Sequence, residues 1–382
     1  MAYIYGAVRP LGLTEKLLRV HWPVVLCAAA LAALGTAALY SVAGGSFQPW
    51  AERHALRFLV ATALLLSLAM VRPEAWLNAA YPVYAAAVLL LALVPFAGVE
   101  ALGAKRWLAF GQVSFQPSEL MKLALVVALA RYYQWLPQPL LSKPQWVAVP
   151  LAMILIPVLL TIKQPDLGSA ALFAALGLGM MFLAGVSPLY FAGGAVAGAG
   201  ALPLIFSRLH DYQRRRIDIF LDPEKDPLGA GYHITQAKIA LGSGGLSGKG
   251  FLQGTQSQLD FVPEKHTDFI ATTIGEEWGF VGLFVILTLF AVMIALLAMM
   301  SWRNRSQFGR LIIAGSALTF FIYVFINIAM VTGLVPVVGI PLPLISYGGT
   351  SMMTVMAGLG LAMSAYVHRD HAIRRDDIGM IW

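Results

Sequence analysis

The stretch from Gly254 to Gly279, GTQSQLDFVPEKHTDFIATTIGEEWG, contains the residues of this chain that are best suited to chemistry. It connects a charged segment to an apolar helix and places Asp268 at the boundary between water and hydrocarbon. A charged group at membrane depth is costly, so it persists where it pairs, lines a polar cavity or takes part in a reaction. A carboxylate at this position can act as a general base that accepts a proton from a hydroxyl group. Glu264 is the nearest alternative base.

Two further polar sites interrupt the apolar segments. Glu119 and Lys122, in the run KRWLAFGQVSFQPSELMK, are three residues apart and would share one face of a helix as an ion pair. Asp166, in KQPDLGS, follows the helix-ending Pro165 and is placed to cap the next helix. For both sites, a purely structural role as an ion pair or a cap is the alternative to a functional one.

A third interruption is the segment GLVPVVGIPLPLISYGGTS, from Gly333 to Ser351. It is too rich in proline and glycine to form a continuous helix. Irregular backbone at membrane depth is tolerated only against protein or a wet cavity. We therefore expect this segment to line a cavity.

The elements that position these residues are predicted to be membrane helices. Hydrophobic residues make up 59% of the 382 residues, charged residues make up 12%, and the mean hydropathy is +0.75. One water-soluble core cannot hide that much apolar surface. The sequence predicts an all-α polytopic protein whose residues 1–382 form a single integral membrane domain. A span needs about 20 apolar residues, and ten segments qualify: 22–43, 55–71, 75–96, 117–134, 145–162, 169–185, 189–207, 272–300, 309–333 and 345–367.

The N-terminal segment sets the predicted orientation. Basic residues precede the first span and no small-residue cleavage site follows it, so the span is a retained anchor rather than a signal peptide. Lysine and arginine are also more frequent in the connections predicted to be cytoplasmic than in the short outer ones. Ten spans then place both termini in the cytoplasm and the long connection 208–272 outside.

The extracytoplasmic loop 208–272 is about twice as rich in charged residues as the chain average of 12%. Two stretches in it, Arg214–Pro223 and Tyr232–Leu241, are compatible with short helices on the membrane surface; the alternative is a solvated connector. The glycine run GSGGLSGKG, from Gly242 to Gly250, lacks the spacing of a Walker loop. Either it brings backbone N–H groups and Lys249 near an anionic headgroup, or it is a simple turn.

Several other classes of site and partner have no support in the sequence. The net charge of +7 mostly reflects topology, and no basic and aromatic platform indicates a nucleic-acid partner. Cys27 is the single cysteine, so neither an internal disulfide nor a thiolate metal site is possible. The seven histidines lack metal-ligand spacing such as HExxH. His266, close to Asp268, is expected to be a solvated loop residue.

Taken together, these motifs resemble the SEDS family (shape, elongation, division and sporulation), and most closely its rod-shape members. The resemblance rests on QPSE, QPDLG, DYQRRR, DPLGAGYHITQAKIALGSGGLSGKG, GTQSQLDFVPEKHTDFI and PVVGIPLPLISYGGTS. These motifs run in register between residues 100 and 365. The residues before them resemble the family mainly in hydropathy.

The resemblance implies a ten-helix SEDS bundle, similar to GT-C glycosyltransferases, in the bacterial cytoplasmic (inner) membrane. It implies a peptidoglycan glycosyltransferase that polymerises lipid II on the outer face of that membrane during cell elongation and rod-shape maintenance. The implied partners are lipid II, membrane lipids and a class B penicillin-binding protein that cross-links the glycan. The family's essential outer-loop aspartate falls in HTDFI, here Asp268. Its other cavity residues match Glu119, Lys122, Asp166 and the segment of Ser346, Gly348 and Ser351.

The residues support such a reaction independently. When a sugar 4-hydroxyl attacks an anomeric carbon that carries undecaprenyl pyrophosphate, Asp268 can take the hydroxyl proton. Inversion at that carbon needs no covalent intermediate. Basic groups near the outer leaflet would stabilise the charge of the leaving pyrophosphate, and the candidates are Arg106, Lys122 and the cluster Arg214–Arg216. A divalent cation, Mg²⁺ or Mn²⁺, is a candidate for the same task, although the sequence shows no dedicated metal site.

Two other functions are compatible with parts of the sequence. A lipid flippase would use the same polar cavity and broken helices, because transporters also bind substrates where helices are interrupted. A non-catalytic scaffold would only hold the cross-linking enzyme. The scaffold gives no reason for a carboxylate at the outer end of the bundle.

Overall fold

The computed structural model describes residues 11–101, 104–110, 113–208, 211–222, 226, 229–259, 264–370 and 373. Most of these residues are helical. The helices are α1 (Leu13–Arg19), α2 (Trp22–Val42), α3 (Ala51–Met70), α4 (Pro73–Ala97), α5 (Pro117–Trp135), α6 (Pro144–Ile162), α7 (Leu167–Ala184), α8 (Pro188–Arg208), α9 (Asp211–Leu221), α10 (Ala230–Ser243), α11 (Thr255–Gln258), α12 (Ile270–Trp302), α13 (Gln307–Val331) and α14 (Gly349–Val367), with a 3-10 turn at Gln138–Leu140.

Each of the ten predicted spans coincides with one of these helices, α2 to α8 and α12 to α14. Within the described part of the chain, eight of the ten are long and apolar enough to cross a membrane, and α5 and α8 are not among the eight. The membrane-embedded, helical fold is confirmed, and the count of ten spans stays a prediction. The charged residues of α5, namely Glu119, Lys122 and Arg131, are all buried. They meet neighbouring helices rather than lipid, which makes their presence in α5 tolerable.

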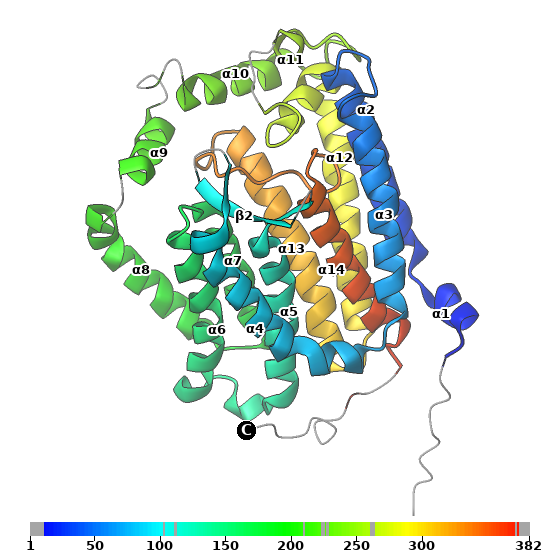
Figure 1. Ribbon diagram of the computed structural model, residues 1–382, viewed down its shortest axis with the longest axis vertical. Helices are drawn as coiled ribbons and strands as arrows, with labels where there is room; N and C mark the ends of the chain where they lie inside the picture. The colour runs from blue at the N-terminus through cyan, green and yellow to red at the C-terminus, as the bar shows by residue number, and fades with distance from the viewer. Residues whose placement is uncertain are drawn as a thin grey trace, which may run out of the picture.

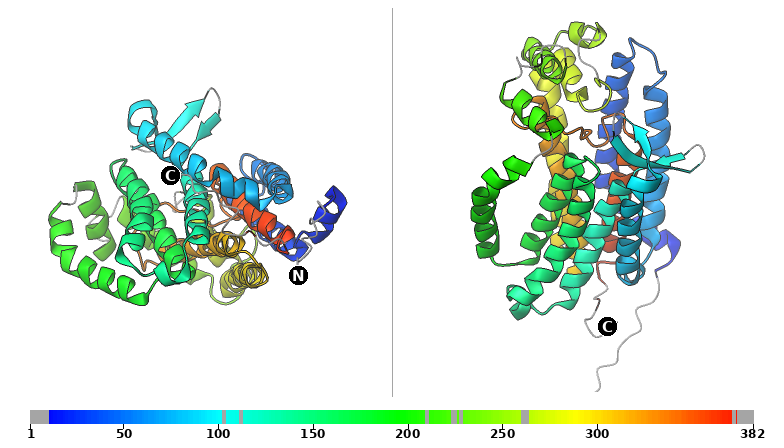
Figure 2. Two further views of the ribbon diagram at one scale, coloured as in Figure 1. Left: turned by 90° about the horizontal axis from the view of Figure 1, so that it is seen from below. Right: turned by 60° about the vertical axis from the view of Figure 1, so that its left-hand side comes forward.

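The long helices other than α8 pack side by side into one bundle (Figure 1, Figure 2). α5 is enclosed by α4, α6, α7, α13 and α14, α3 packs along α14, and α12 packs against both α2 and α13. α1 and the C-terminal end of α14 lie at the same end of the bundle, where Arg19 pairs with Asp370 at 2.9 Å. α10 and α11 lie at the opposite end (Figure 1).

The described part of the connection between α8 and α12 contains three helices, α9, α10 and α11. α8 and α9 stand at one side of the bundle, and α10 and α11 lead back over its end towards α12 (Figure 1). The two predicted loop helices correspond to α9 and α10. Ala237 and Ala240 of α10 are buried, and α10 packs on α12. At least this part of the connection is therefore packed structure rather than a solvated connector.

A small antiparallel sheet joins α4 to α5, and the sequence did not predict it. Its strands are β1 (Val99–Ala101), β2 (Ala104–Phe110) and β3 (Val113–Phe115), in the order β1-β2-β3. β1 and β3 are too short to show a clear alternation of apolar and polar side chains, and β2, with the sequence AKRWLAF, does not alternate. The sheet matters for the site because β2 carries Arg106.

Residues 332–348, between α13 and α14, contain no helix, as their prolines and glycines predict. This irregular segment is covered by neighbouring helices. A methyl group on Gly35 of α2 would lie 2.6 Å from Ile345 Cα, and one on Gly168 of α7 would lie 2.8 Å from the backbone oxygen of Val338. Glycine at these two positions allows the helices to touch the segment directly. Protein thus surrounds irregular backbone at membrane depth.

Candidate active site

Asp268 lies in the turn before α12, next to the helix N-cap Phe269. Its backbone oxygen accepts a hydrogen bond of 2.9 Å from Asn327 Nδ2 of α13. Its side chain faces the irregular segment, because a methyl group on Gly339 would lie 3.3 Å from Asp268 Oδ2. Gly339 has a φ of 75°, a left-handed conformation that favours glycine. The absence of a side chain at Gly339 leaves space beside the carboxylate.

The surroundings of Asp268 make it a stronger base than an exposed aspartate. Burial raises its pKa from the ordinary 3.8 to about 6, and the negative charge of Glu264 adds to the rise. A carboxyl group with this pKa is still mostly ionised at neutral pH, and its pKa is closer to the operating pH than that of an exposed aspartate. Glu264 itself is exposed and accepts a hydrogen bond of 2.7 Å from Thr267 Oγ1. The ionised state and the raised pKa of Asp268 suit it to accept a proton.

Asn327 holds the backbone on both sides of the Asp268 carboxylate. Its side chain is completely buried. Nδ2 donates to the backbone oxygens of Asp268 and Ile340, at 2.9 and 2.7 Å. α13 thereby ties the turn before α12 to the irregular segment. Asn327 was not among the site residues predicted from the sequence, although an isolated amide in an apolar span indicates a functional position.

Glu119 and Lys122 form the predicted ion pair, with 2.7 Å between Oε1 and Nζ. Tyr323 of α13 completes the group. Its hydroxyl donates to Glu119 Oε2 at 3.2 Å and accepts a hydrogen bond from Lys122 Nζ. All three side chains are buried. Tyr323 and Asn327 are four residues apart and share a face of α13, so one helix face contacts both this group and Asp268. The sequence did not single out Tyr323, because an aromatic residue in an apolar span resembles core.

Asp166 caps α7, as its position after Pro165 predicts. Its Oδ1 accepts from Ser169 N at 3.1 Å, and its Oδ2 accepts from Ser169 Oγ at 2.7 Å. Arg106 reaches the same turn, where its Nη2 donates to the backbone oxygen of Pro165 at 2.6 Å. Asp166 also acts electrostatically on the Tyr323 hydroxyl. Asp166 therefore lies within electrostatic reach of the Glu119 group, and Arg106 contacts the turn beside Asp166.

Ser346, Gly348 and Ser351 shape the turn that leads into α14. Ser346 Oγ accepts from the backbone N–H of Leu342 at 2.8 Å. Ser351 Oγ donates to the backbone oxygen of Gly348 at 3.0 Å, and Gly348 is the N-cap of α14. These bonds are local and explain why small polar residues occur here. Contact of this turn with a substrate stays a prediction.

His266 is not a solvated loop residue, so that expectation was wrong. Its ring stacks on Trp50, with 4.7 Å between ring centroids and 17° between planes. Its backbone oxygen accepts a hydrogen bond of 2.8 Å from the N–H of Tyr347. Burial lowers the pKa of His266, and Glu264 opposes that effect. The sequence could not show this, because Trp50 is distant in the chain.

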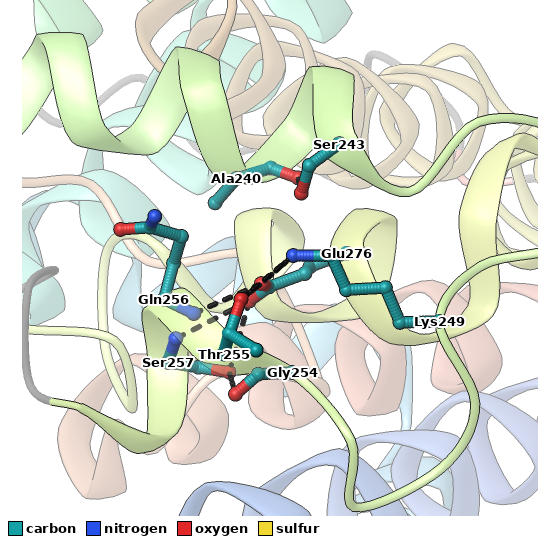
Figure 3. A network of polar contacts seen from close by, with 8 residues as sticks. All are labelled: Ala240, Ser243, Lys249, Gly254, Thr255, Gln256, Ser257 and Glu276. Atoms are coloured by element: carbon teal, nitrogen blue, oxygen red, sulfur yellow. Dashed lines mark hydrogen bonds and ion pairs between the residues drawn. The ribbon is translucent and has the colours of Figure 1, made fainter.

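Lys249 belongs to a polar network that joins α11 to α12 (Figure 3). Its Nζ lies 2.7 Å from Glu276 Oε1 and 2.8 Å from Thr255 Oγ1. The same carboxylate accepts hydrogen bonds from the backbone N–H groups of Gln256 and Ser257, at 2.9 and 3.2 Å. A buried Glu276 carboxylate without a cationic partner would destabilise the fold. Pairing with Glu276 therefore explains a positively charged residue at position 249 by structure alone.

The glycine run 242–250 packs against the first turns of α12. The backbone N–H groups of Lys249 and Gly250 donate to the backbone oxygens of Glu276 and Glu277, both at 3.0 Å. α12 is kinked at Gly279, which has φ 65° and ψ −162°. Since two N–H groups of the run are engaged with α12, the arrangement favours a turn over an anion-binding loop.

The cluster Arg214–Arg216 lies in α9, where Arg214 Nη2 donates to the backbone oxygen of Ser207 at 2.9 Å. The side chains of Arg215 and Arg216 lie outside the described residues.

The carboxylates near Asp268 bear on the question of a metal ion. Within the ranges given above, no three or more His, Cys, Asp or Glu side chains lie close enough to hold one. Asp268 and Glu264 interact electrostatically but supply fewer oxygens than the six that Mg²⁺ prefers. A cation at Asp268 would need water and substrate phosphate oxygens as further ligands.

The sequence pattern of the FtsW, RodA and SpoVE family, described as cell cycle proteins, matches residues 21–371. The chain belongs to this family. Its similarity to peptidoglycan glycosyltransferase MrdB of Escherichia coli (strain K12) is 44% identity over 319 residues, 83% of this chain and 86% of that one. A probable peptidoglycan glycosyltransferase FtsW of Geobacter metallireducens is 33% identical over 356 residues, 89% of this chain and 93% of that one.

Solved structures of the FtsW, RodA and SpoVE family have the same fold. One of them is a chain of a peptidoglycan synthase complex, from a study of the structural coordination of polymerization and crosslinking. It superposes on this chain with a TM-score of 0.80 at 32% sequence identity. The match covers 92% of this chain and 98% of that chain. Rod shape determining protein RodA of Thermus thermophilus has a TM-score of 0.70 at 29% identity, with coverage of 92% and 98%. The resemblance to the SEDS family is thereby confirmed.

Proposed function

We propose that this chain is a peptidoglycan glycosyltransferase that polymerises lipid II during cell elongation and rod-shape maintenance. The observation that carries the proposal is the environment of Asp268. Its side chain is half-buried, has a pKa of about 6 and lies beside Gly339, where a methyl group would approach Oδ2 to 3.3 Å. Support also comes from the names of the relatives, since MrdB of E. coli is called a peptidoglycan glycosyltransferase and FtsW of G. metallireducens a probable one.

In the proposed reaction, Asp268 is the general base. A sugar hydroxyl attacks the anomeric carbon of a second lipid-linked sugar, and its proton moves to the Asp268 carboxylate. The new carbon–oxygen bond forms as the bond to the pyrophosphate breaks, so the configuration at that carbon inverts. Asn327 and Gly339 support this step by fixing the backbone of Asp268 and leaving its Oδ2 accessible.

The departing pyrophosphate gains negative charge, which fixed cations must offset. Arg106 and Lys122 are the proposed groups. Arg106 is anchored through Nη2 on the turn before α7. Lys122 is held in place by Glu119 and Tyr323. Such preorganised charges need little rearrangement during the reaction.

A divalent cation, Mg²⁺ or Mn²⁺, is a further proposal. The carboxylates of Asp268 and Glu264 are the protein groups that would hold it, and substrate phosphates would complete the shell. When bound, such a cation would neutralise charge on the pyrophosphate.

The proposed location is the bacterial cytoplasmic membrane, with both termini inside and the site facing outward. In support, α1 and the end of α14 share one end of the bundle, and α10 and α11 lie at the other (Figure 1). Single cysteines at two exposed positions, Gln258→Cys and Arg305→Cys, test this orientation. In cells with a permeabilised outer membrane, an impermeant thiol reagent should label Gln258→Cys only. Labelling of Arg305→Cys alone would reverse the orientation.

The proposed protein partner is a class B penicillin-binding protein. The support is the similar chain of the peptidoglycan synthase complex, whose study concerns polymerization and crosslinking. The partner would cross-link the glycan that this chain makes.

Polymerisation of purified lipid II, with and without the partner, tests the proposed function. Wild-type protein should form glycan strands, and Asp268→Asn should not. Movement of lipid II across a vesicle membrane without glycan formation would instead establish a flippase. Partner binding with neither activity would leave only a scaffold.

A further inference from the structure

Arg57, in the second turn of α3, is a cation that the proposed mechanism does not yet use. Its Cζ lies 4.6 Å from the centre of the Tyr347 ring. A methyl group on Gly349, the first residue of α14, would lie 3.2 Å from the Cζ and Nε atoms of Arg57. The guanidinium therefore rests against an aromatic ring and the first turn of a helix.

No carboxylate of the described residues balances the charge of Arg57. Within the described ranges, its guanidinium forms no ion pair and donates no hydrogen bond. Its side chain is half-buried. The N-terminal end of a helix such as α14 carries partial positive charge, so a cation placed there is unfavourable on its own. An anion bound to Arg57 would remove that repulsion.

Arg57 is also linked to the turn that contains Asp268. Tyr347, which holds the guanidinium, donates its backbone N–H to the oxygen of His266 at 2.8 Å. The ring of His266 in turn stacks on Trp50, next to the start of α3. The beginning of α3, the turn before α12 and the turn before α14 therefore meet in one place.

We infer that Arg57 binds the pyrophosphate of a polyprenyl-linked sugar at the site of Asp268. The inference rests on the proposed function. An arginine fork can give two parallel N–H···O bonds to one phosphate, which a lysine ammonium cannot. The Tyr347 ring fixes the guanidinium by a cation–π contact. Arg57 is a substrate-binding residue in this arrangement and takes no part in proton transfer.

The binding experiment uses the full-length protein in nanodiscs of zwitterionic lipid. The probes are geranylgeranyl pyrophosphate and geranylgeraniol, which share a chain and differ in charge. Arg57→Gln should weaken binding of the pyrophosphate about tenfold or more, the usual effect of losing charge-assisted hydrogen bonds. It should leave binding of the alcohol unchanged. Lys143→Gln, which removes an equal charge from an exposed lysine before α6, is the matched control and should leave both unchanged.

A kinetic readout separates substrate binding from catalysis. With lipid II as substrate, Arg57→Gln should raise KM by a larger factor than it lowers kcat. Arg57→Lys should recover only part of the affinity, because the ammonium keeps the charge but loses the fork. If Arg57→Gln does not fold, Tyr347→Leu removes the supporting ring and keeps the charge, and it should weaken pyrophosphate binding severalfold.

The proposal is overturned if folded Arg57→Gln, or Tyr347→Leu in its place, binds geranylgeranyl pyrophosphate as well as wild type does. It is also overturned if phosphatidylglycerol added to the nanodisc abolishes binding of geranylgeranyl pyrophosphate to the wild-type protein, since the guanidinium would then bind a bulk lipid headgroup. Wild-type protein that polymerises lipid II with unaffected Arg57→Gln would refute only this inference. If Arg57→Gln loses pyrophosphate binding but the wild-type protein never polymerises lipid II, only the proposed function is refuted.

Discussion

Replacing Asp268 with asparagine is expected to abolish polymerisation and, at neutral pH, to stabilise the fold. The loss of activity should be on the order of 10² to 10⁴, the usual contribution of a positioned general base. The gain in stability follows from the burial of the carboxylate. A neutral amide of nearly the same shape avoids the cost of holding a charge at that place.

The pKa of Asp268 sets the size of the stability gain. Burial and Glu264 raise this pKa from 3.8 to about 6, a difference of about 2 units that corresponds to at most about 3 kcal/mol. The folded protein binds the proton more tightly than the unfolded chain does. The stabilisation from the protonated group is therefore complete below pH 3.8 and is lost as the pH rises through about 6.

The difference in thermal stability between Asp268→Asn and wild type, measured in detergent, checks this reasoning. The variant should unfold at a higher temperature at pH 7.5, and the advantage should shrink towards pH 4. Effects of acid on other groups cancel because they are common to both proteins. Glu100→Gln is the control, since it removes an equal charge from an exposed position that does not act on the pKa of Asp268, and it should change stability little.

Two results would refute the reasoning about Asp268. A well-folded Asp268→Asn protein that polymerises lipid II at nearly the wild-type rate would move the base elsewhere, with Glu264 the nearest carboxylate. A stability difference that does not vary with pH would show that the buried charge is not the cause.

Three further outcomes are expected. The rate of polymerisation should fall about tenfold per pH unit below the Asp268 pKa of about 6, and Glu264→Gln should move this midpoint to lower pH; a rate–pH profile that Glu264→Gln leaves unchanged would contradict the electrostatic link. Glu119→Gln leaves Lys122 buried without its carboxylate, at a cost of about 3–5 kcal/mol, and thermal unfolding measures it; recovery of both stability and polymerisation by adding Lys122→Met would make the pair purely structural. Asn327→Leu removes the donor to two backbone oxygens, those of the partly buried bond to Asp268 and the buried bond to Ile340, at about 1–3 kcal/mol each. It should also reduce polymerisation through Asp268, so full activity in that variant would argue against a positioning role.

Much of the fold follows from local patterns. The ten helices coincide with the predicted apolar segments because the span of a membrane sets the length of an apolar run. The non-helical backbone of residues 332–348 follows from proline and glycine, which act on neighbouring residues. The cap by Asp166 and the pair of Glu119 and Lys122 join residues three positions apart. Interactions of this range are decided by helix geometry alone.

The environment of the site was decided by tertiary structure. Tyr323 joins the Glu119 pair, Asn327 holds Asp268, and Trp50 stacks on His266, and each of these contacts connects distant parts of the chain. No local pattern specifies such contacts, because they depend on which helix faces pack together. The same packing pairs Lys249 with the buried Glu276 and places no carboxylate of the described residues in an ion pair with Arg57. The sequence by itself determined the residue types and helices of the site, and the packing of those helices decided which of the described charges are paired within the protein and which are not.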